Sequence, residues 1–295
     1  MKRAWKYYSG VFAHENELDD ILSGWYGLRK FGYDVVNYLE PKIIVELGTH
    51  KGTSFLSFCN SVRNNTLSTK LYAIDTWQGD SQTGLYVSEV LEKLKKIIKK
   101  HYSTQNIKLV KKSFNTAVTQ FKNKKIDLLH IDGLHTYNAV KNDYNLWNKL
   151  TSENGLIIFH DIHCKNPGFG VHIFWSEIKK ENYTLELKHS NGLGILFKNR
   201  EVYEKLRPLE SSWQAYYSTV AQLDYYKNFP KNKKSSLAKE YEEKLKTLEK
   251  VTIRRNNELI KENDALVKQL ATINSSNIQK IAQKYYSTRK KIIGK

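Results

Sequence analysis

The chain has 295 residues, which is enough to bury one substantial core and leave length for an appendage. Its two cysteines, Cys59 and Cys164, lie far apart without metal-ligand spacing, which argues against a disulfide scaffold or a zinc site and favours a reducing compartment. No stretch approaches about 18 consecutive apolar residues, so we expect a cytoplasmic protein. The net charge of +18 suits an anionic membrane surface, acidic substrates or nucleic acid, but no nucleic-acid-binding motif is present and we disfavour that partner.

Residues 1–40 mix aromatic and acidic side chains, with helical spacing around Glu17 to Leu22 and again around Tyr33 to Leu39. This pattern predicts an N-terminal helical cap. Aromatic residues at helical spacing usually serve packing, and we favour packing here over a role in covering a ligand. Pro41 ends the second helix.

An apolar run that stops at an acid and two glycines comes next. Ile43 to Val45 is typical of a buried parallel strand, and helical spacing resumes at Ser54. The Glu-Leu-Gly-x-x-x-Gly pattern that begins at Glu46 places Gly48 and Gly52 in a tight turn before a helix N-terminus, where backbone N–H groups meet ligands. It differs from the Gly-x-Gly-x-x-Gly of dinucleotide sites. We predict a cofactor crevice, the alternative being an ordinary strand-to-helix turn.

A second strand over residues 70–77 delivers Asp75 to its carboxyl end. In doubly wound folds an acid at this place accepts hydrogen bonds from ribose hydroxyls, while the alternative role is a turn or helix-capping aspartate. The polar loop 77–84 is predicted to be a lid or acceptor loop. A lysine-rich helix over 87–101 and a third strand over 106–113 follow.

Acids and histidines gather after the next two predicted strands. Asp132 and His135 follow a strand in the stretch that begins at Lys125. The next strand, predicted over residues 155–163, delivers His160, Asp161 and His163. Because the carboxyl ends of neighbouring parallel strands share one edge of a sheet, we expect these side chains to meet in one crevice. A purely structural role for the histidines is the alternative.

These segments together resemble the class I S-adenosylmethionine-dependent methyltransferase family, of the type often found in bacterial polysaccharide and glycan gene clusters. The resemblance covers roughly residues 40 to 200. The segments that carry it are the motif at Glu46, Asp75, Ile131-Asp132-Gly133-Leu134-His135-Thr136-Tyr137 with Asp143, Phe159-His160-Asp161, and Gly170-Val171 with Trp175. It implies a Rossmann-like α/β fold: a seven-stranded sheet with helices on both faces, closed by a hairpin at Asn191-Gly192.

The resemblance also implies the cofactor, S-adenosyl-L-methionine, and two groups of site residues. For catalysis we expect Asp132, His135 and His160, with His135 favoured as general base because imidazole titrates near neutrality. The residues expected to bind the cofactor are Glu46, Gly48, Thr49, Gly52, Ser54, Asp75, Thr76, Ser113 and Asp132.

A divalent metal is a further expectation from the family. In metal-dependent sugar and catechol O-methyltransferases, acids after the fourth and fifth strands hold magnesium, and Asp132, His160 and Asp161 match those places. The histidine departs from the pattern, since imidazole suits manganese, zinc or iron better than magnesium. A magnesium or manganese site and a metal-free site both stay open.

The sequence therefore predicts four segments: a cap (1–40), a methyltransferase domain (41–200), a helical segment with linker (201–236) and a basic, coiled-coil-like tail (237–295). The tail is expected to form a homo-oligomer or to tether the protein to a biosynthetic partner. Its cationic end is compatible with peripheral contact at the inner membrane surface.

The leading hypothesis is O-methylation of a sugar hydroxyl in a cell-surface polysaccharide or glycan precursor. The alternative is a non-catalytic adaptor with a degenerate methyltransferase fold and a coiled-coil tether.

Overall fold

The computed structural model describes residues 4–18, 23–80, 82, 84–86 and 88–228, and single helical positions at 247, 250, 254, 258, 261 and 265. The chain divides into two compact units, Arg3–Leu248 and Glu249–Lys295. In the second unit Arg254 Nε donates a hydrogen bond to Glu258 Oε1 at 3.0 Å, one helical turn away. The predicted coiled coil and the linker before it otherwise lie outside the described residues.

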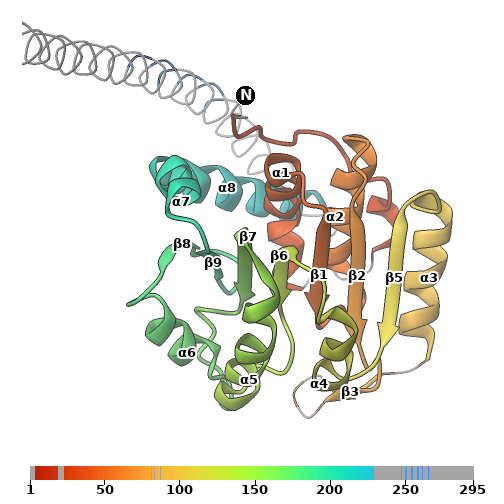
Figure 1. Ribbon diagram of the computed structural model, residues 1–295. Coiled ribbons are helices and arrows are strands. Elements are labelled where there is room, and N and C mark those ends of the chain that lie inside the picture. The colour runs from red at the N-terminus through yellow and green to blue at the C-terminus, as the bar shows by residue number, and fades with distance from the viewer. Residues whose placement is uncertain are drawn as a thin grey trace, which may run out of the picture. The chain divides into compact units, whose positions relative to one another are not determined.

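The first unit contains a seven-stranded sheet in the order β5-β2-β1-β6-β7-β9-β8 (Figure 1). Strands β5, β2, β1, β6 and β7 are parallel, whereas β9 is antiparallel to both β7 and β8. This arrangement confirms the predicted fold class. The strands are β1 (Ile43–Leu47), β2 (Lys70–Asp75), β5 (Asn106–Lys111), β6 (Ile126–Ile131), β7 (Thr151–His160), β8 (Tyr183–Leu187) and β9 (Leu193–Phe197).

Helices cover both faces of the sheet, because alternate residues of the central strands point to opposite sides. Val45 and Leu47 of β1 join the core beneath α4, α5 and α6, while Glu46 points the other way, toward α2. The helices are η1 (Glu15–Glu17), η2 (Gly24–Leu28), α1 (Arg29–Leu39), α2 (Thr53–Asn64), α3 (Glu89–His101), α4 (Phe114–Ala117), η3 (Val118–Phe121), α5 (Tyr137–Trp147), η4 (Asn148–Leu150), α6 (Val171–Ile178), α7 (Arg200–Leu206), η5 (Arg207–Leu209) and α8 (Glu210–Asn228).

The N-terminal segment and α8 share one aromatic layer. The rings of Trp5 and Trp213 lie 4.3 Å apart, and Trp5 Nε1 donates to the hydroxyl of Tyr217 at 3.0 Å. Tyr217 in turn donates to Asp34 of α1 at 2.6 Å, and burial raises the pKa of that carboxyl well above its usual range. The aromatic residues of the cap therefore serve packing, as the favoured interpretation has it, and the two ends of the unit are tied together.

Three local features differ from the sequence prediction. The loop 77–84 contains a short ribbon, in which β3 (Gly79–Asp80) pairs with β4 (Gly84–Leu85). The first turn of the cap is 3-10 helix, and residues 19–22 of the predicted helix lie outside the described part. The β8–β9 turn centres on Ser190 and Asn191, both at positive φ, with Gly192 after them. Gly192 also has a positive φ, of 87°, and a Cβ there would lie 2.3 Å from the His163 ring, so both backbone conformation and packing require glycine.

Among the described residues, we find no helix whose length and hydropathy would let it cross a lipid bilayer.

Candidate active site

The site lies where the strand order reverses, between the carboxyl ends of β1 and β6. Asp132, the first residue after β6, donates its backbone N–H to Leu47 O at 2.9 Å and so holds the two strand ends together. Gly48 follows β1 with φ +90°, and a Cβ there would lie 1.9 Å from the carbonyl oxygen of Asp132. Glycine is required at this position because both the conformation and the close approach exclude a side chain.

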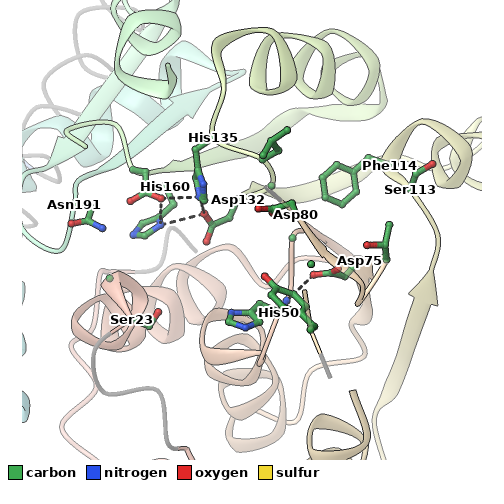
Figure 2. A pocket seen from close by; sticks show the side chains of 18 residues that line it. Ser23, His50, Asp75, Asp80, Ser113, Phe114, Asp132, His135, His160 and Asn191 are labelled. Atoms are coloured by element: carbon green, nitrogen blue, oxygen red, sulfur yellow. Dashed lines mark hydrogen bonds and ion pairs between the residues drawn. The ribbon is translucent and has the colours of Figure 1, made fainter. Parts of the chain in front are cut away.

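A cavity of about 390 Å³ opens at this point, a volume within the usual range of small-molecule sites. Figure 2 shows Ser113, Phe114 and Asp75 toward one end, Ser23 and Asn191 toward the other, and Asp132, His135 and His160 between them. The lining residues are Ser23, Gly24, Gly48, His50, Asp75, Thr76, Gly79, Asp80, Tyr86, Ser113, Phe114, Asp132, Gly133, Leu134, His135, His160, Asp161 and Asn191.

Asp75 organises the end that also holds Phe114. Its Oδ2 accepts a hydrogen bond from the backbone N–H of His50 at 2.8 Å, and its Oδ1 accepts one from that of Trp77 at 2.7 Å. One carboxylate therefore joins the glycine turn after β1 to the loop after β2. Each oxygen keeps a lone pair for a ligand hydroxyl, and the Phe114 ring offers an apolar surface beside it.

Two acids and two histidines form the centre of the site, and we call Asp132, His135, His160 and Asp161 the acid–histidine cluster. His135 Nε2 lies 3.0 Å from Asp161 Oδ2 and 3.6 Å from Asp132 Oδ1. His160 Nδ1 lies 3.3 Å from Asp132 Oδ1 and 3.4 Å from Asp161 Oδ2. Each carboxylate thus faces both imidazole rings.

The four charges of the cluster stabilise one another. Burial by itself lowers the pKa of His135, but its contacts with Asp132 and Asp161 raise it to about 9. Burial likewise opposes ionisation of His160, and the same two carboxylates raise its pKa well above the usual range. The histidines in turn lower the pKa of Asp132, and that of Asp161 to about 2, against the effect of burial. These shifts favour the charged form of all four groups, two carboxylates and two imidazolium ions.

Asp161 occupies a strained position, as functional residues often do. Its φ of 61° is unusual for a residue other than glycine. Its Oδ1 is buried and finds no hydrogen-bond partner among the described residues. Asp132, His135 and Asp161 each offer one ligand atom, all within 4.8 Å of one another. This set contains His135 where the sequence predicts His160, whose Nδ1 lies 3.3 Å from Asp132 Oδ1 and 3.4 Å from Asp161 Oδ2.

The cavity contains most of the residues predicted to take part. Gly48, Asp75, Thr76, Ser113 and Asp132 of the expected cofactor group line it. The expected catalytic residues Asp132, His135 and His160 line it as well, together with Asp161.

Glu46 and Ser54, which the sequence predicts to bind the cofactor, are not among the residues that line this cavity and lie in a layer behind it. Glu46 points to the α2 face of the sheet, where its Oε1 accepts a hydrogen bond from Ser54 Oγ at 2.5 Å and lies 2.9 Å from His130 Nδ1. All three side chains are buried. Successive side chains of a strand point to opposite faces of the sheet. Glu46 is one place before the last residue of β1, so its side chain points to the face that α2 covers and not out of the strand end.

Thr49 and Gly52 are also absent from the described cavity lining. Thr49 is buried. Gly52 has φ +87°, and a Cβ there would lie 2.6 Å from Leu94 of α3. Its role is therefore to bring α3 close to the start of α2.

Sequence reasoning missed the end of the cavity that Ser23, Gly24 and Asn191 line. Ser23 and Gly24 come from the cap, and Asn191 comes from the β8–β9 turn. A Cβ on Gly24 would lie 2.9 Å from His160 Cε1 and 3.1 Å from Asn191 Nδ2, so this glycine keeps that end open. The one available signal was the Asn191-Gly192 pair, which the sequence analysis interprets as a hairpin turn and not as part of a binding site.

A family model described as a methyltransferase domain matches residues 45–162, from β1 to just beyond β7. Residues 45–162, which include all or part of each of the five parallel strands of the sheet, are therefore similar to a methyltransferase domain.

The chain is also similar to individual proteins. The chain is 36% identical over 190 residues to the uncharacterised protein y4gI of Sinorhizobium fredii, an alignment that covers 64% of this chain and 21% of that protein. The chain thus spans about a fifth of the length of this curated relative. Among solved structures, the SAH-bound methyltransferase PaMTH1 of Podospora anserina is similar with a TM-score of 0.46 at 17% identity, over 63% of this chain and 82% of that one. The SAH complex of an O-methyltransferase from Bacillus cereus has a TM-score of 0.43 at 15% identity, over 57% and 79%.

Proposed function

We propose that the protein is an S-adenosylmethionine-dependent O-methyltransferase whose acceptor is a sugar hydroxyl of a polysaccharide or glycan precursor. The observation that carries this proposal is that one cavity holds both Asp75 and the acid–histidine cluster. The first suits a ribose, and the second lies where a hydroxyl group would be activated.

The residues at the Asp75 end fit the cofactor. Gly48 leaves room for close backbone approach, Asp75 has free lone pairs for the ribose hydroxyls, and Phe114 offers a flat surface for adenine. Asp75 and Asp80 add acidic groups to the cavity wall, which suits a sulfonium cation, whereas the charges of Asp132 and Asp161 are balanced by His135 and His160. S-adenosylmethionine, when bound, supplies the electrophilic methyl group: an O–CH₃ bond forms while the S–CH₃ bond breaks, and sulfur keeps the electron pair.

The acceptor hydroxyl must lose its proton during this transfer. Asp132 and Asp161 are weak bases because the histidines lower the pKa of both. His135 is protonated at neutral pH, with a pKa of about 9, so it is a poor base in the metal-free state. The cluster therefore favours the metal-dependent alternative over a histidine base.

Asp132, His135 and Asp161 would hold the divalent ion, in exchange for the proton on His135 Nε2. Two carboxylates and one imidazole suit manganese, zinc or iron better than magnesium. Such an ion would supply Lewis acidity that lowers the pKa of an acceptor hydroxyl, so that its proton could pass to solvent water. The unpartnered Asp161 Oδ1 supports this assignment, because a buried carboxylate oxygen without a partner is costly.

The far end of the cavity supports a polar acceptor. Ser23 and Asn191 offer neutral donors and acceptors there, next to the ring of His160. A sugar, with hydroxyls on adjacent carbons, matches such a set of neutral hydrogen-bonding groups.

Calorimetry with S-adenosylhomocysteine tests the cofactor site. We expect the protein to bind it, and Asp75→Ala to weaken binding at least about tenfold, since a lost hydrogen-bond acceptor for two hydroxyls costs more than about 1.4 kcal/mol. Glu153→Ala, an exposed acid at the start of β7, is the control and should bind as the wild type does. Failure of the wild-type protein to bind would remove the proposal. Transfer of labelled methyl from S-adenosylmethionine to a panel of mono- and oligosaccharides then tests the acceptor class.

A further inference from the structure

Gln82 stands at the tip of the β3–β4 ribbon, outside the cavity lining but in contact with its centre. Its side-chain Oε1 accepts two hydrogen bonds from His135, one from the backbone N–H and one from the ring Nδ1, both at 2.9 Å. Its Nε2 donates to Gly168 O at 3.3 Å. The ribbon thus reaches across to the loops that follow β6 and β7.

These contacts determine which way the Gln82 amide points. The backbone N–H of His135 can only donate, so the group that faces it must be the amide oxygen. The carbonyl oxygen of Gly168 can only accept, so the group that faces it must be the amide NH₂. Both contacts require the same orientation, and in that orientation Nδ1 of His135 must carry a proton.

The protonated Nδ1 leaves Nε2 as the ring atom directed at Asp132 and Asp161. Phe169 stacks on the same ring, with centroids 4.6 Å apart and an angle of 4° between the planes. The Gly170 N–H donates to His135 O at 2.7 Å. His135 is therefore held on its face, on its backbone and at Nδ1, and the contact at Nδ1 comes from the ribbon.

We propose that Gln82 is a positioning residue of this site: its amide oxygen fixes the His135 ring so that Nε2 faces the two carboxylates, and it makes that orientation depend on the ribbon. The proposal rests on the proposed function only in that His135 serves methyl transfer. The second contacts of metal-binding histidines orient the ring and commonly change activity or metal affinity 10- to 100-fold, which sets the size of effect to expect.

The ribbon itself is built to hold Gln82 at this place. Gly79 and Gly84 both have positive φ, and a Cβ on Gly79 would lie 1.9 Å from Gly84 O. Asp80 Oδ1 accepts the backbone N–H of Gln82 at 2.7 Å and so shapes the tip. Since Asp80 also lines the cavity, the ribbon contacts the site through Asp80 as well as through Gln82.

Three variants test the proposal. Gln82→Leu removes both the acceptor and the donor. Gln82→Glu keeps an oxygen for His135 but loses the donor to Gly168. Gln78→Leu makes the same chemical change at an exposed position at the base of the ribbon and serves as the matched control.

The first measurement does not depend on catalysis. In ¹⁵N-histidine-labelled protein, a hydrogen-bonded Nδ1–H of His135, assigned by its loss in His135→Gln, should give a slowly exchanging downfield proton signal. We expect the signal in the wild type, Gln82→Glu and Gln78→Leu, and its loss in Gln82→Leu. Persistence of the signal in a folded Gln82→Leu protein would overturn the proposal.

The second measurement compares S-adenosylhomocysteine binding with methyl transfer. Gln82→Leu should keep its Kd within about twofold while the rate falls 10- to 100-fold, and Gln82→Glu should recover most of the rate. An equal loss of methyl-transfer rate in Gln82→Leu and Gln82→Glu would overturn the proposal, because it would show that the contact with Gly168 matters and the orientation of His135 does not. If the wild type binds no cofactor, the proposed function fails, and the proton signal still decides the role of Gln82.

Discussion

His135 Nε2 lies 3.0 Å from Asp161 Oδ2, although the two residues follow different strands of the sheet. This contact joins the loop after β6 to the strained residue after β7, and Asp132 completes the set from the other side of the ring. Because His135 Nε2 faces both carboxylates, its protonation contributes to the stability of the site and would compete with the divalent ion proposed above.

The first prediction concerns pH. Burial lowers the pKa of His135, but the carboxylates overcome this and raise it from 6.5 to about 9, so the folded state holds the proton more tightly than the unfolded chain. The resulting stability is fully present below pH 6.5 and is lost as the pH rises toward 9. The free energy of unfolding of chelator-treated protein should fall over that range by on the order of 3 kcal/mol.

Urea unfolding at successive pH values measures this slope. His135→Gln should flatten it, whereas the control His163→Gln, at a half-exposed histidine near Glu186, should retain it. A wild-type stability that stays constant or increases from pH 6.5 to 9 would contradict the assignment.

The second prediction concerns metal binding. Asp161→Asn keeps the size of the side chain but removes its negative charge. A neutral amide then replaces the carboxylate whose Oδ1 has no hydrogen-bond partner among the described residues. Binding of Mn²⁺, measured by the paramagnetic resonance signal of the free ion, should weaken at least about tenfold. Glu153→Gln controls for the loss of one acidic charge elsewhere. Equal Mn²⁺ affinity in Asp161→Asn and wild type would exclude Asp161 as a ligand.

The third prediction separates two reasons why a position requires glycine: a positive φ, and a backbone contact too close for a side chain. Gly48→Ala introduces a Cβ at φ +90° and 1.9 Å from Asp132 O, so it should destabilise the fold by about 3 kcal/mol or more. Gly84→Ala introduces one at φ +77° with no described atom within 4 Å, and should cost about 1 to 2 kcal/mol. Denaturant unfolding of both variants provides the comparison. A similar cost for both would mean that the strand end at Gly48 relaxes away from Asp132.

The fourth prediction tests the division of the cavity. Phe114→Ala should weaken S-adenosylhomocysteine binding about tenfold, because aromatic stacking on a base is worth about 1 to 3 kcal/mol. Gly24→Ala pushes a Cβ against His160 and Asn191 and should lower methyl transfer at least about tenfold, with cofactor binding almost unchanged. Calorimetry and a transfer assay on the same two proteins measure both effects. If Gly24→Ala weakened the cofactor as much as Phe114→Ala does, the two ends would not be separate subsites.

Much of the fold could be predicted from sequence because local patterns carried it. The apolar run before Glu46, the acid at Asp75 and the Asn191-Gly192 turn each mark an element through the chemistry of neighbouring residues. The observed strands β1, β2, β5 and β6 coincide closely with the predicted ones. The strand β7 begins earlier than predicted, at Thr151, where its pairing with β6 is irregular.

The sequence by itself determined the strand–helix alternation, the glycine turn and the presence of acids and histidines at strand ends, because these depend on residues close together in the chain. Only the tertiary structure decided that Glu46 turns away toward Ser54 and His130, that His135 rather than His160 joins the metal-compatible set, and that Gln82 reaches His135 from the ribbon. The physical reason is that side-chain direction and loop-to-loop contact depend on strand register and on how distant segments pack, and no local pattern encodes either one.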